Sequence, residues 1–465
     1  MNKYSTEIYL IIHILAGIVI SFFPLTYYIV VAIYIIALIK ILSSTKSTYY
    51  AILFSAYLVG WELTGRMTYA GLPHEFTKYA ISSILLLAFM LNRDRKWDTP
   101  IVIFFLLLIP AVFLTHGRTF EESRQLVSAN LSGLLCLTIS VLVFNGQRIS
   151  TLFLTRVFLL ILLPIVTMLT YLIVKTPDLS SLDFGYQSNF VSSIYGPNQV
   201  SSILGLGILI IGISYLVKIK LFQYNIIGLP ILLLMSYRAL ATFSRGGVLT
   251  AFVILILGYL LVLFSATHSS KLLFRNISLI VLLVVGSYFV FDYANKITEG
   301  QLYNRYAGVK GERKLSNEEY TSGRALITAI DVQMFADNLL TGIGVGMGKF
   351  ERSNYGFPVE VAAHIEFTRL LAEHGILGGI ALLIMIIYPI LIFYRQNNSI
   401  YTKVLIVMCI GFCFMFMSHS ATRLAAPVFL YGLAFVQVIP FSFFRKSYTI
   451  REQAYSSVKM HVITH

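Results

Sequence analysis

The stretch ILGGIALLIMIIYPILIF, Ile376–Phe393, runs for eighteen residues without a charged side chain. A helix needs about 20 predominantly apolar residues to cross the bilayer core, so this stretch predicts a transmembrane helix. The whole chain agrees, because 57% of its 465 residues are hydrophobic, 12% are charged and the mean hydropathy is +0.79. Soluble domains have about a quarter charged residues and disordered chains are poor in apolar ones, so both classes are excluded.

Comparable apolar segments recur along the chain and predict an all-α polytopic membrane protein with about fourteen transmembrane helices, twelve being the alternative. The weakest segments are the third, which carries Glu62 near its end, and the ninth, which lies between Gln223 and Arg238. The expected spans are centred on Ile14, Val31, Ala56, Leu85, Leu107, Leu135, Leu162, Leu209, Leu232, Ile254, Val284, Ile384, Cys409 and Leu430.

The net charge of +14 would suit a nucleic-acid-binding protein, but the chain is too apolar for that class. Cytoplasmic loops of membrane proteins retain Lys and Arg. With a cytoplasmic N-terminus and alternating spans, the inside loops hold 18 cations and 4 acids, which is the whole +14, while 17 of each fall outside. This favours both termini inside and no nucleic-acid partner, with the surplus charge near anionic membrane lipid.

One polar stretch, from about Ala294 to Glu373, is too long and too polar to be a span. Long loops in compact proteins are usually functional, and the topology places this one outside the cytoplasm. The N-terminus shows no cleavable signal peptide. The expected parts are transmembrane helices 1–11 (1–292), an extracytoplasmic catalytic loop with short helices (293–374), helices 12–14 (375–446) and a cytoplasmic tail (447–465).

Metal and disulfide chemistry have no support in the sequence. Cys136, Cys409 and Cys413 all lie in apolar runs, where thiols act as small apolar side chains. No His-x-x-x-His pattern or carboxylate cluster suggests a metal site, and we expect no cofactor.

Arg245 stands at the start of an expected span, where an arginine costs roughly 2.5–3.5 kcal/mol on insertion scales. A guanidinium fork there suits a carboxylate or phosphate. Ser244 can cap the following helix, and Gly246 and Gly247 lack side chains, so an anion can approach free N–H groups. The segment predicts a site for a membrane-bound phosphate; the alternative is an interfacial arginine that reaches toward lipid headgroups.

Arg324 lies in the first turn of a helix expected from Gly323 to about Asp337, with Ser322 as its N-cap. A helix N-terminus with an arginine is a second possible anion contact, the alternative being a solvated surface arginine. Downstream, Gly342–Gly348 alternates glycine with other residues. The spacing differs from the dinucleotide-binding pattern and predicts a tight turn instead.

His364 begins an amphipathic segment that Gly375 is expected to end before the twelfth span. Histidine is a common general base because its pKa lies near neutrality; the alternative is a capping or surface residue. His374 is a weaker candidate of the same kind.

In this order, an Asn-containing turn, Ser-Arg-Gly-Gly, Ser-Gly-Arg, a glycine turn and a His helix ending in Glu-x-Gly resemble the O-antigen ligase/polymerase family over about Tyr195 to Gly379. These are bacterial membrane glycosyltransferases. The resemblance implies a GT-C-like fold, an undecaprenyl-diphosphate-linked oligosaccharide donor, and a lipid-linked glycan or lipid A–core acceptor. It implies arginines that bind the diphosphate and a histidine that deprotonates the acceptor hydroxyl.

Carried over by motif, the diphosphate-binding residues are Arg245 and Arg324, helped by Gly246 and Gly247, and the base is His364. The Glu-x-Gly pair departs from the family pattern because His374 stands between Glu373 and Gly375, which puts the role of Glu373 in doubt. Weaker candidates are Asn198, Glu373, His374 and Arg66. Arg118 and Arg423 are further external arginines that either touch substrate or are structural.

The expected activity is a metal-independent, inverting polymerisation of lipid-linked repeat units for an O-antigen, capsule or exopolysaccharide. The alternatives are ligation of the glycan to lipid A–core and, in another class, a lipid-linked oligosaccharide flippase. About fourteen spans favour the polymerase over the ligase. The expected location is the bacterial inner membrane with the site on the periplasmic side, near a chain-length regulator and a flippase as partners.

Overall fold

The computed structural model describes residues 5–68, 71–93, 95–176, 192, 195–265, 285–286, 288–310, 313–316, 323–357, 359–395 and 399–440. The described chain is mostly helical, and seven of its helices are long and apolar enough to cross a membrane: α2, α6, α7, α8, α10, α16 and α17. Shorter apolar helices cover Thr6–Phe22, Phe76–Leu91, Thr99–Leu114 and Asn225–Ala241. A multi-pass helical membrane protein is therefore confirmed.

The helices are α1 (Ser5–Phe22), α2 (Thr26–Ser43), α3 (Ser47–Met67), α4 (Phe76–Leu91), α5 (Thr99–Leu106), α6 (Phe120–Phe144), α7 (Thr151–Lys175), α8 (Pro197–Leu216), α9 (Gly228–Ala241), α10 (Arg245–Ser265), α12 (Gln301–Ala307), α14 (Arg324–Asp337), α15 (Gly348–Glu351), α16 (Glu366–Arg395), α17 (Ile400–Ser420) and α18 (Ala425–Leu433). The 3-10 helices of the described residues include η1 (Pro110–Leu114), η4 (Asn225–Ile227) and η5 (Arg352–Tyr355). The strands are β1 (Arg148–Ser150), β2 (Val309–Lys310), β3 (Arg313–Lys314) and β4 (Gln437–Ile439).

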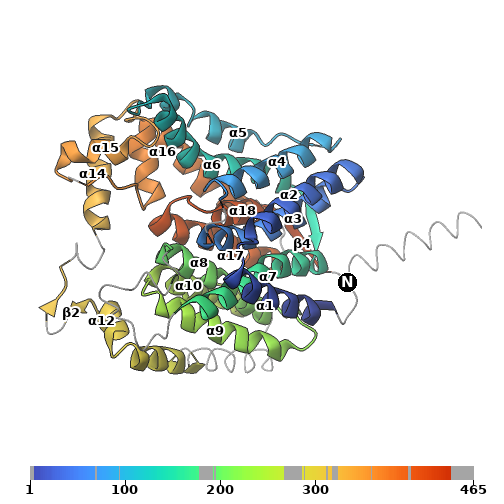
Figure 1. Ribbon diagram of the computed structural model, residues 1–465. Coiled ribbons are helices and arrows are strands. Elements are labelled where there is room, and N and C mark those ends of the chain that lie inside the picture. Colours follow the sequence, from blue (N-terminus) through green and yellow to red (C-terminus); the bar gives the residue numbers. More distant parts are fainter. Residues whose placement is uncertain are drawn as a thin grey trace, which may run out of the picture.

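The bundle has an inner and an outer set of helices. α7 and α8 are buried over most of their length, whereas α2, α10 and α16 expose many large apolar side chains, as expected of helices that face lipid. The N-terminus and β4 lie at one end of the bundle, and α12, α14 and α15 lie at the other (Figure 1). All three cysteines are buried, as expected of thiols in apolar runs, and none forms a disulfide within the described residues.

Several spans differ from the expected helices. The fifth is divided into α5, which ends at Leu106, and η1, which begins at Pro110. Proline has no N–H to donate to the carbonyl of the preceding turn, which weakens the helix there. The fourteenth is the nine-residue α18, followed by β4, which pairs in parallel with β1. This pairing, which the sequence did not predict, satisfies backbone groups of the extended segment that follows the short helix. The span centred on Val284 lies largely outside the described residues.

Two glycine predictions are confirmed. Gly375 has φ 59° and ψ −143° and interrupts α16, so the amphipathic segment ends there before the apolar span. Gly342, Gly344 and Gly346 all have positive φ, between 68° and 98°, which identifies the alternating glycines as a tight turn. α14 begins at Arg324, one residue later than expected; the predicted cap Ser322 lies outside the described residues.

Candidate functional site

His364 is held by the connection between α17 and α18. The backbone N–H of Ala421 donates to the His364 carbonyl oxygen at 3.0 Å, and Arg423 Nη2 donates to the Ala363 carbonyl oxygen at 3.0 Å. These two bonds fix the residues before α16 against the residues before α18. The half-buried His364 side chain is within the electrostatic range of the Arg423 guanidinium.

Two predicted anion-binding residues come together near this histidine. Arg245 is the first residue of α10 and Arg324 is the first residue of α14. Burial lowers the pKa of Arg324, and repulsion from Arg305, Arg245 and Arg423 lowers it further. We call Arg245, Arg305, Arg324 and Arg423 the arginine group.

The position of these arginines is unfavourable for the fold itself. A helix N-terminus carries a partial positive charge, so a cation there costs roughly 0.3–1 kcal/mol. Arg245 and Arg324 both occupy such a position and also repel one another. An anion that binds between them would remove this repulsion and gain contact with two helix N-termini.

The cationic surroundings also determine the state of His364. Burial lowers its pKa to about 4, and the charges of Arg423, Arg324, Arg352 and His419 contribute to the shift. The imidazole is therefore neutral at neutral pH and able to accept a proton.

This shift predicts an acid limb at low pH. Because the folded pKa lies below 6.5, the base form should persist as pH falls, and kcat/KM should decline only near pH 4. Arg423→Gln removes the charge that contributes most to the lowered His364 pKa, so the acid limb should move to higher pH. A pH profile of kcat/KM checks both points; a wild-type limb at about 6.5, unchanged in Arg423→Gln, contradicts them.

Asn198 joins α8 to the start of α10. Ser244 Oγ donates to Asn198 Oδ1 at 2.7 Å, and Ser202 Oγ lies 2.8 Å from His419 Nε2. The weaker candidate Asn198 thus contacts the side chain of Ser244, the residue before Arg245. His419, which the sequence left without a role, is brought into the site by the end of α17.

Gly246 and Gly247 serve close packing in this structure. A Cβ on Gly246 would overlap the His419 ring, and one on Gly247 would overlap the Ser201 backbone of α8. The predicted approach of an anion to their N–H groups stays a prediction. Packing alone explains why neither position has room for a side chain.

Two non-glycine residues with positive φ flank the site. Phe243 has φ 56° and precedes Ser244 and Arg245; Ala421 has φ 50° and bonds to His364. Such conformations cost about 1–3 kcal/mol each and cluster at functional sites.

An ion pair that the sequence did not predict fixes α14 to the segment before His364. Arg352 Nε and Nη2 donate to Asp331 Oδ1 at 2.9 and 2.8 Å, and Nη1 donates to the Val361 carbonyl at 2.6 Å. Both side chains are 1% exposed. Thr368 of α16 donates to the other Asp331 oxygen at 3.1 Å. Asp331 therefore joins α14, η5 and α16.

Asp331→Ala should destabilise this region by roughly 3–5 kcal/mol, because it leaves the Arg352 charge buried without its partner. Asp337→Ala is the control, since Asp337 lies on the same helix but is exposed. Thermal unfolding of the purified protein measures both. Equal midpoints for the two variants would show that the buried pair does not support the fold.

Glu373 belongs to a buried ion triad. Arg369 donates to Glu366 at 2.5 Å and to Glu373 at 2.7 Å, and all three residues are at most 3% exposed. Glu366 also accepts from the Thr422 hydroxyl at 3.1 Å. Glu373 further contacts the N–H of Gly346. The structure thus gives Glu373 an architectural function, connecting the glycine turn to α16.

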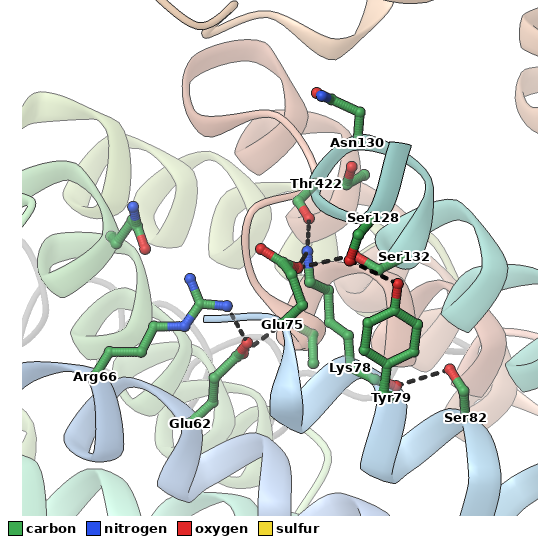
Figure 2. Close-up of polar contacts among 12 residues, drawn as sticks. Glu62, Arg66, Glu75, Lys78, Tyr79, Ser82, Ser128, Asn130, Ser132 and Thr422 are labelled. Carbon is green, nitrogen blue, oxygen red and sulfur yellow. Dashed lines mark hydrogen bonds and ion pairs between the residues drawn. The ribbon is translucent and has the colours of Figure 1, made fainter. Parts of the chain in front are cut away.

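The two remaining weaker candidates lie apart from the arginine group's centre. His374 is 1% exposed inside α16, next to Leu108. Arg66, at the end of α3, donates to Glu62 at 2.8 Å, and Figure 2 shows this pair beside Glu75 and Lys78. The exposed Arg118 pairs with Glu360 at 2.5 Å. Within the described residues, no three His, Cys, Asp or Glu side chains are grouped to hold a metal ion.

Comparison with known proteins addresses the same part of the chain. Residues 230–383 match the Wzy_C family model, described as O-antigen ligase. This range contains Arg245, Arg324 and His364. None of the curated proteins compared with the chain matches it. The resemblance seen in the motifs is confirmed over residues 230–383, where the chain is similar to the O-antigen ligase family.

Proposed function

We propose that the protein polymerises lipid-linked polysaccharide repeat units, transferring the glycan from undecaprenyl diphosphate to an acceptor sugar hydroxyl. The observation that carries the proposal is the arginine group beside a neutral, half-buried His364. The similarity to this family supports a glycosyltransferase acting on lipid-linked glycans. Arg305 and Arg423 extend the site expected from the motifs.

The chemistry requires two things from the protein. His364 takes the proton of the acceptor hydroxyl, whose oxygen forms the new bond to the anomeric carbon. The bond from that carbon to the diphosphate breaks, and the electron pair leaves with the diphosphate. The arginine group stabilises the departing charge. Attack from the side opposite the diphosphate inverts the anomeric centre.

An apolar cavity of about 720 Å³ suits the lipid part of the donor. It lies between α8, α9 and α10, and its lining includes Leu232, Phe252 and Tyr306. Burial raises the pKa of Tyr306 to about 12, and the nearby positive charge of Arg245 opposes this shift. Tyr306 therefore connects the cavity to the arginine group. An isoprenoid chain in this cavity would bring its diphosphate to the arginine group.

The bundle end that carries the arginine group is proposed to face the periplasm from the bacterial inner membrane, with a GT-C-like fold and about fourteen spans. A chain-length regulator and a flippase would act beside it. A flippase should instead keep its charged residues within the spans, lining a cavity. The ligase is the second candidate, because the family model is described as O-antigen ligase.

The test uses purified protein with lipid-linked repeat units, alone or together with lipid A–core. Glycans that lengthen on the lipid-linked acceptor support the polymerase; transfer to lipid A–core alone supports the ligase. EDTA should leave the rate unchanged, because the arginines neutralise the diphosphate charge. Strong inhibition by EDTA, restored by a divalent ion, would overturn metal independence.

A further inference from the structure

A second cavity, of about 220 Å³, lies among α2, α3 and the start of α4. Its mouth is formed by the exposed Gly71, Pro73 and His74, and its interior is lined by the buried Trp61 and Glu62. The cavity therefore opens at the end of the bundle where α3 ends and α4 begins. None of the predicted catalytic residues lines it except the weaker candidate Arg66.

Arg66, which lines this cavity, has a buried hydrogen-bond donor without a partner among the described residues. Its Nη2 donates to Glu62 at 2.8 Å, but its Nε has no hydrogen-bond partner among the described residues, although the side chain is only 9% exposed. A buried donor without an acceptor is unfavourable, by about 1–3 kcal/mol. A ligand oxygen in the cavity would satisfy it.

The charge of this cavity differs from that of the arginine group. The Arg66 charge is balanced by Glu62, which also accepts from the Ala425 N–H at 2.7 Å. Behind them Lys78 pairs with Glu75 (Figure 2). A charge-balanced cavity with aromatic and apolar walls and a few hydrogen-bonding groups suits a neutral polar ligand such as a sugar ring, and suits diphosphate poorly.

Arg423 is the member of the arginine group that interacts with the cavity residue Arg66. Arg423 interacts electrostatically with Arg66 and with Arg324, and it contributes to the pKa shift of His364. Tyr195 interacts with both Arg66 and Arg423. The segment that joins α17 to the start of α18 bonds to both sites: the Ala421 N–H donates to the His364 carbonyl oxygen at 3.0 Å, and the Ala425 N–H donates to Glu62 at 2.7 Å. A sugar in the cavity would therefore lie on the same segment that holds His364.

We propose that this cavity binds the acceptor sugar. The assignment rests on the proposed function, because an inverting displacement needs the nucleophile opposite the departing diphosphate. Glu62 and Arg66 orient the ring by hydrogen bonds, and Trp61 and Phe76 contribute to its apolar wall. The hydroxyl that reacts points toward His364.

Trp61 offers a binding measurement that does not depend on catalysis. The chain has two tryptophans, and Trp97 is exposed, so Trp97→Phe leaves Trp61 as the single reporter. Titration with the repeat-unit oligosaccharide, freed from lipid, should change its fluorescence saturably. Inorganic pyrophosphate should not. No response to the oligosaccharide, or an equal response to pyrophosphate, overturns the assignment whether or not the protein is a polymerase.

Gly65→Leu in the Trp97→Phe background tests whether the response comes from the cavity. A Cβ at Gly65 meets only Thr26 and Val30, at 3.9 and 4.0 Å, so the new side chain can enter the cavity without backbone strain. It should abolish the fluorescence response and raise the acceptor KM at least about tenfold with little change in kcat. Gly379→Leu, at a helical glycine with similar room outside the cavity, is the control. An unchanged acceptor KM in Gly65→Leu would overturn the assignment.

Gly65→Ala is a smaller substitution that tests the same position if Gly65→Leu fails to fold. Its single methyl fills part of the cavity and should give a smaller rise in acceptor KM. A rise that follows side-chain size, with normal thermal unfolding, supports the sugar site. Equal effects of Gly65→Ala and Gly379→Ala would contradict it.

Discussion

His364→Ala should lower kcat for glycosyl transfer by about 10²–10⁴-fold, the usual contribution of a positioned general base. The imidazole is neutral because burial and neighbouring arginines lower its pKa to about 4, so its removal takes away the proton acceptor of the site. Donor binding should change little, because the diphosphate contacts belong to the arginines. Initial rates at saturating lipid-linked substrate measure the effect.

His116→Ala is the matched control for this variant. His116 is exposed and bonds only locally, to the Leu114 carbonyl at 2.9 Å. It should retain the parent rate. A His364→Ala protein that folds normally and turns over as fast as His116→Ala would remove the histidine from the mechanism.

Arg245→Ala and Arg324→Ala should each reduce kcat/KM for the lipid-linked donor by roughly 100-fold. The reason is that a charge-assisted hydrogen bond contributes about 1.5–3 kcal/mol and a guanidinium can make two. Lysine at either position keeps the charge but cannot donate two parallel hydrogen bonds, so the loss of kcat/KM should be intermediate. The free-energy loss in the double alanine variant should be smaller than the sum of the losses in the two single variants, because both residues act on one diphosphate.

Stability separates this role from a structural one. Each arginine occupies a helix N-terminus that disfavours it, so alanine there should leave the thermal midpoint unchanged or slightly raised. Arg124→Ala, which breaks an exposed pair with Glu121 on α6, is the activity control. If activity and thermal stability fell together in Arg245→Ala and Arg324→Ala, the arginines would be structural instead.

Many helices of the bundle could be predicted because the hydropathy of each segment depends only on its own residues. The long apolar runs of α7, α8, α10 and α16 are helices. The break before Pro110 could not be predicted from proline alone, because Pro164 and Pro389 lie inside α7 and α16. The pairing of β1 with β4 could not be predicted either, because it joins strands almost 290 residues apart through their backbones.

The site was predictable only where motifs marked it. Arg245, Arg324 and His364 stand in recognisable segments, and the structure brings them near one another. Arg305 and Arg423 stand in no such pattern; they reach the site through the packing of α12 and the α17–α18 connection. Glu373 carries a motif position but serves a buried triad, because its partner Arg369 lies one helical turn earlier.

The central claim is that the arginine group and His364 form a glycosidic bond at the expense of a lipid diphosphate. The most direct measurement is mass spectrometry of purified protein incubated with one defined lipid-linked repeat. The wild-type protein should release one undecaprenyl diphosphate for each new linkage, with inverted anomeric configuration, and His364→Ala should release almost none. Movement of the intact lipid-linked repeat across a vesicle membrane, without any new linkage or released diphosphate, would contradict the account.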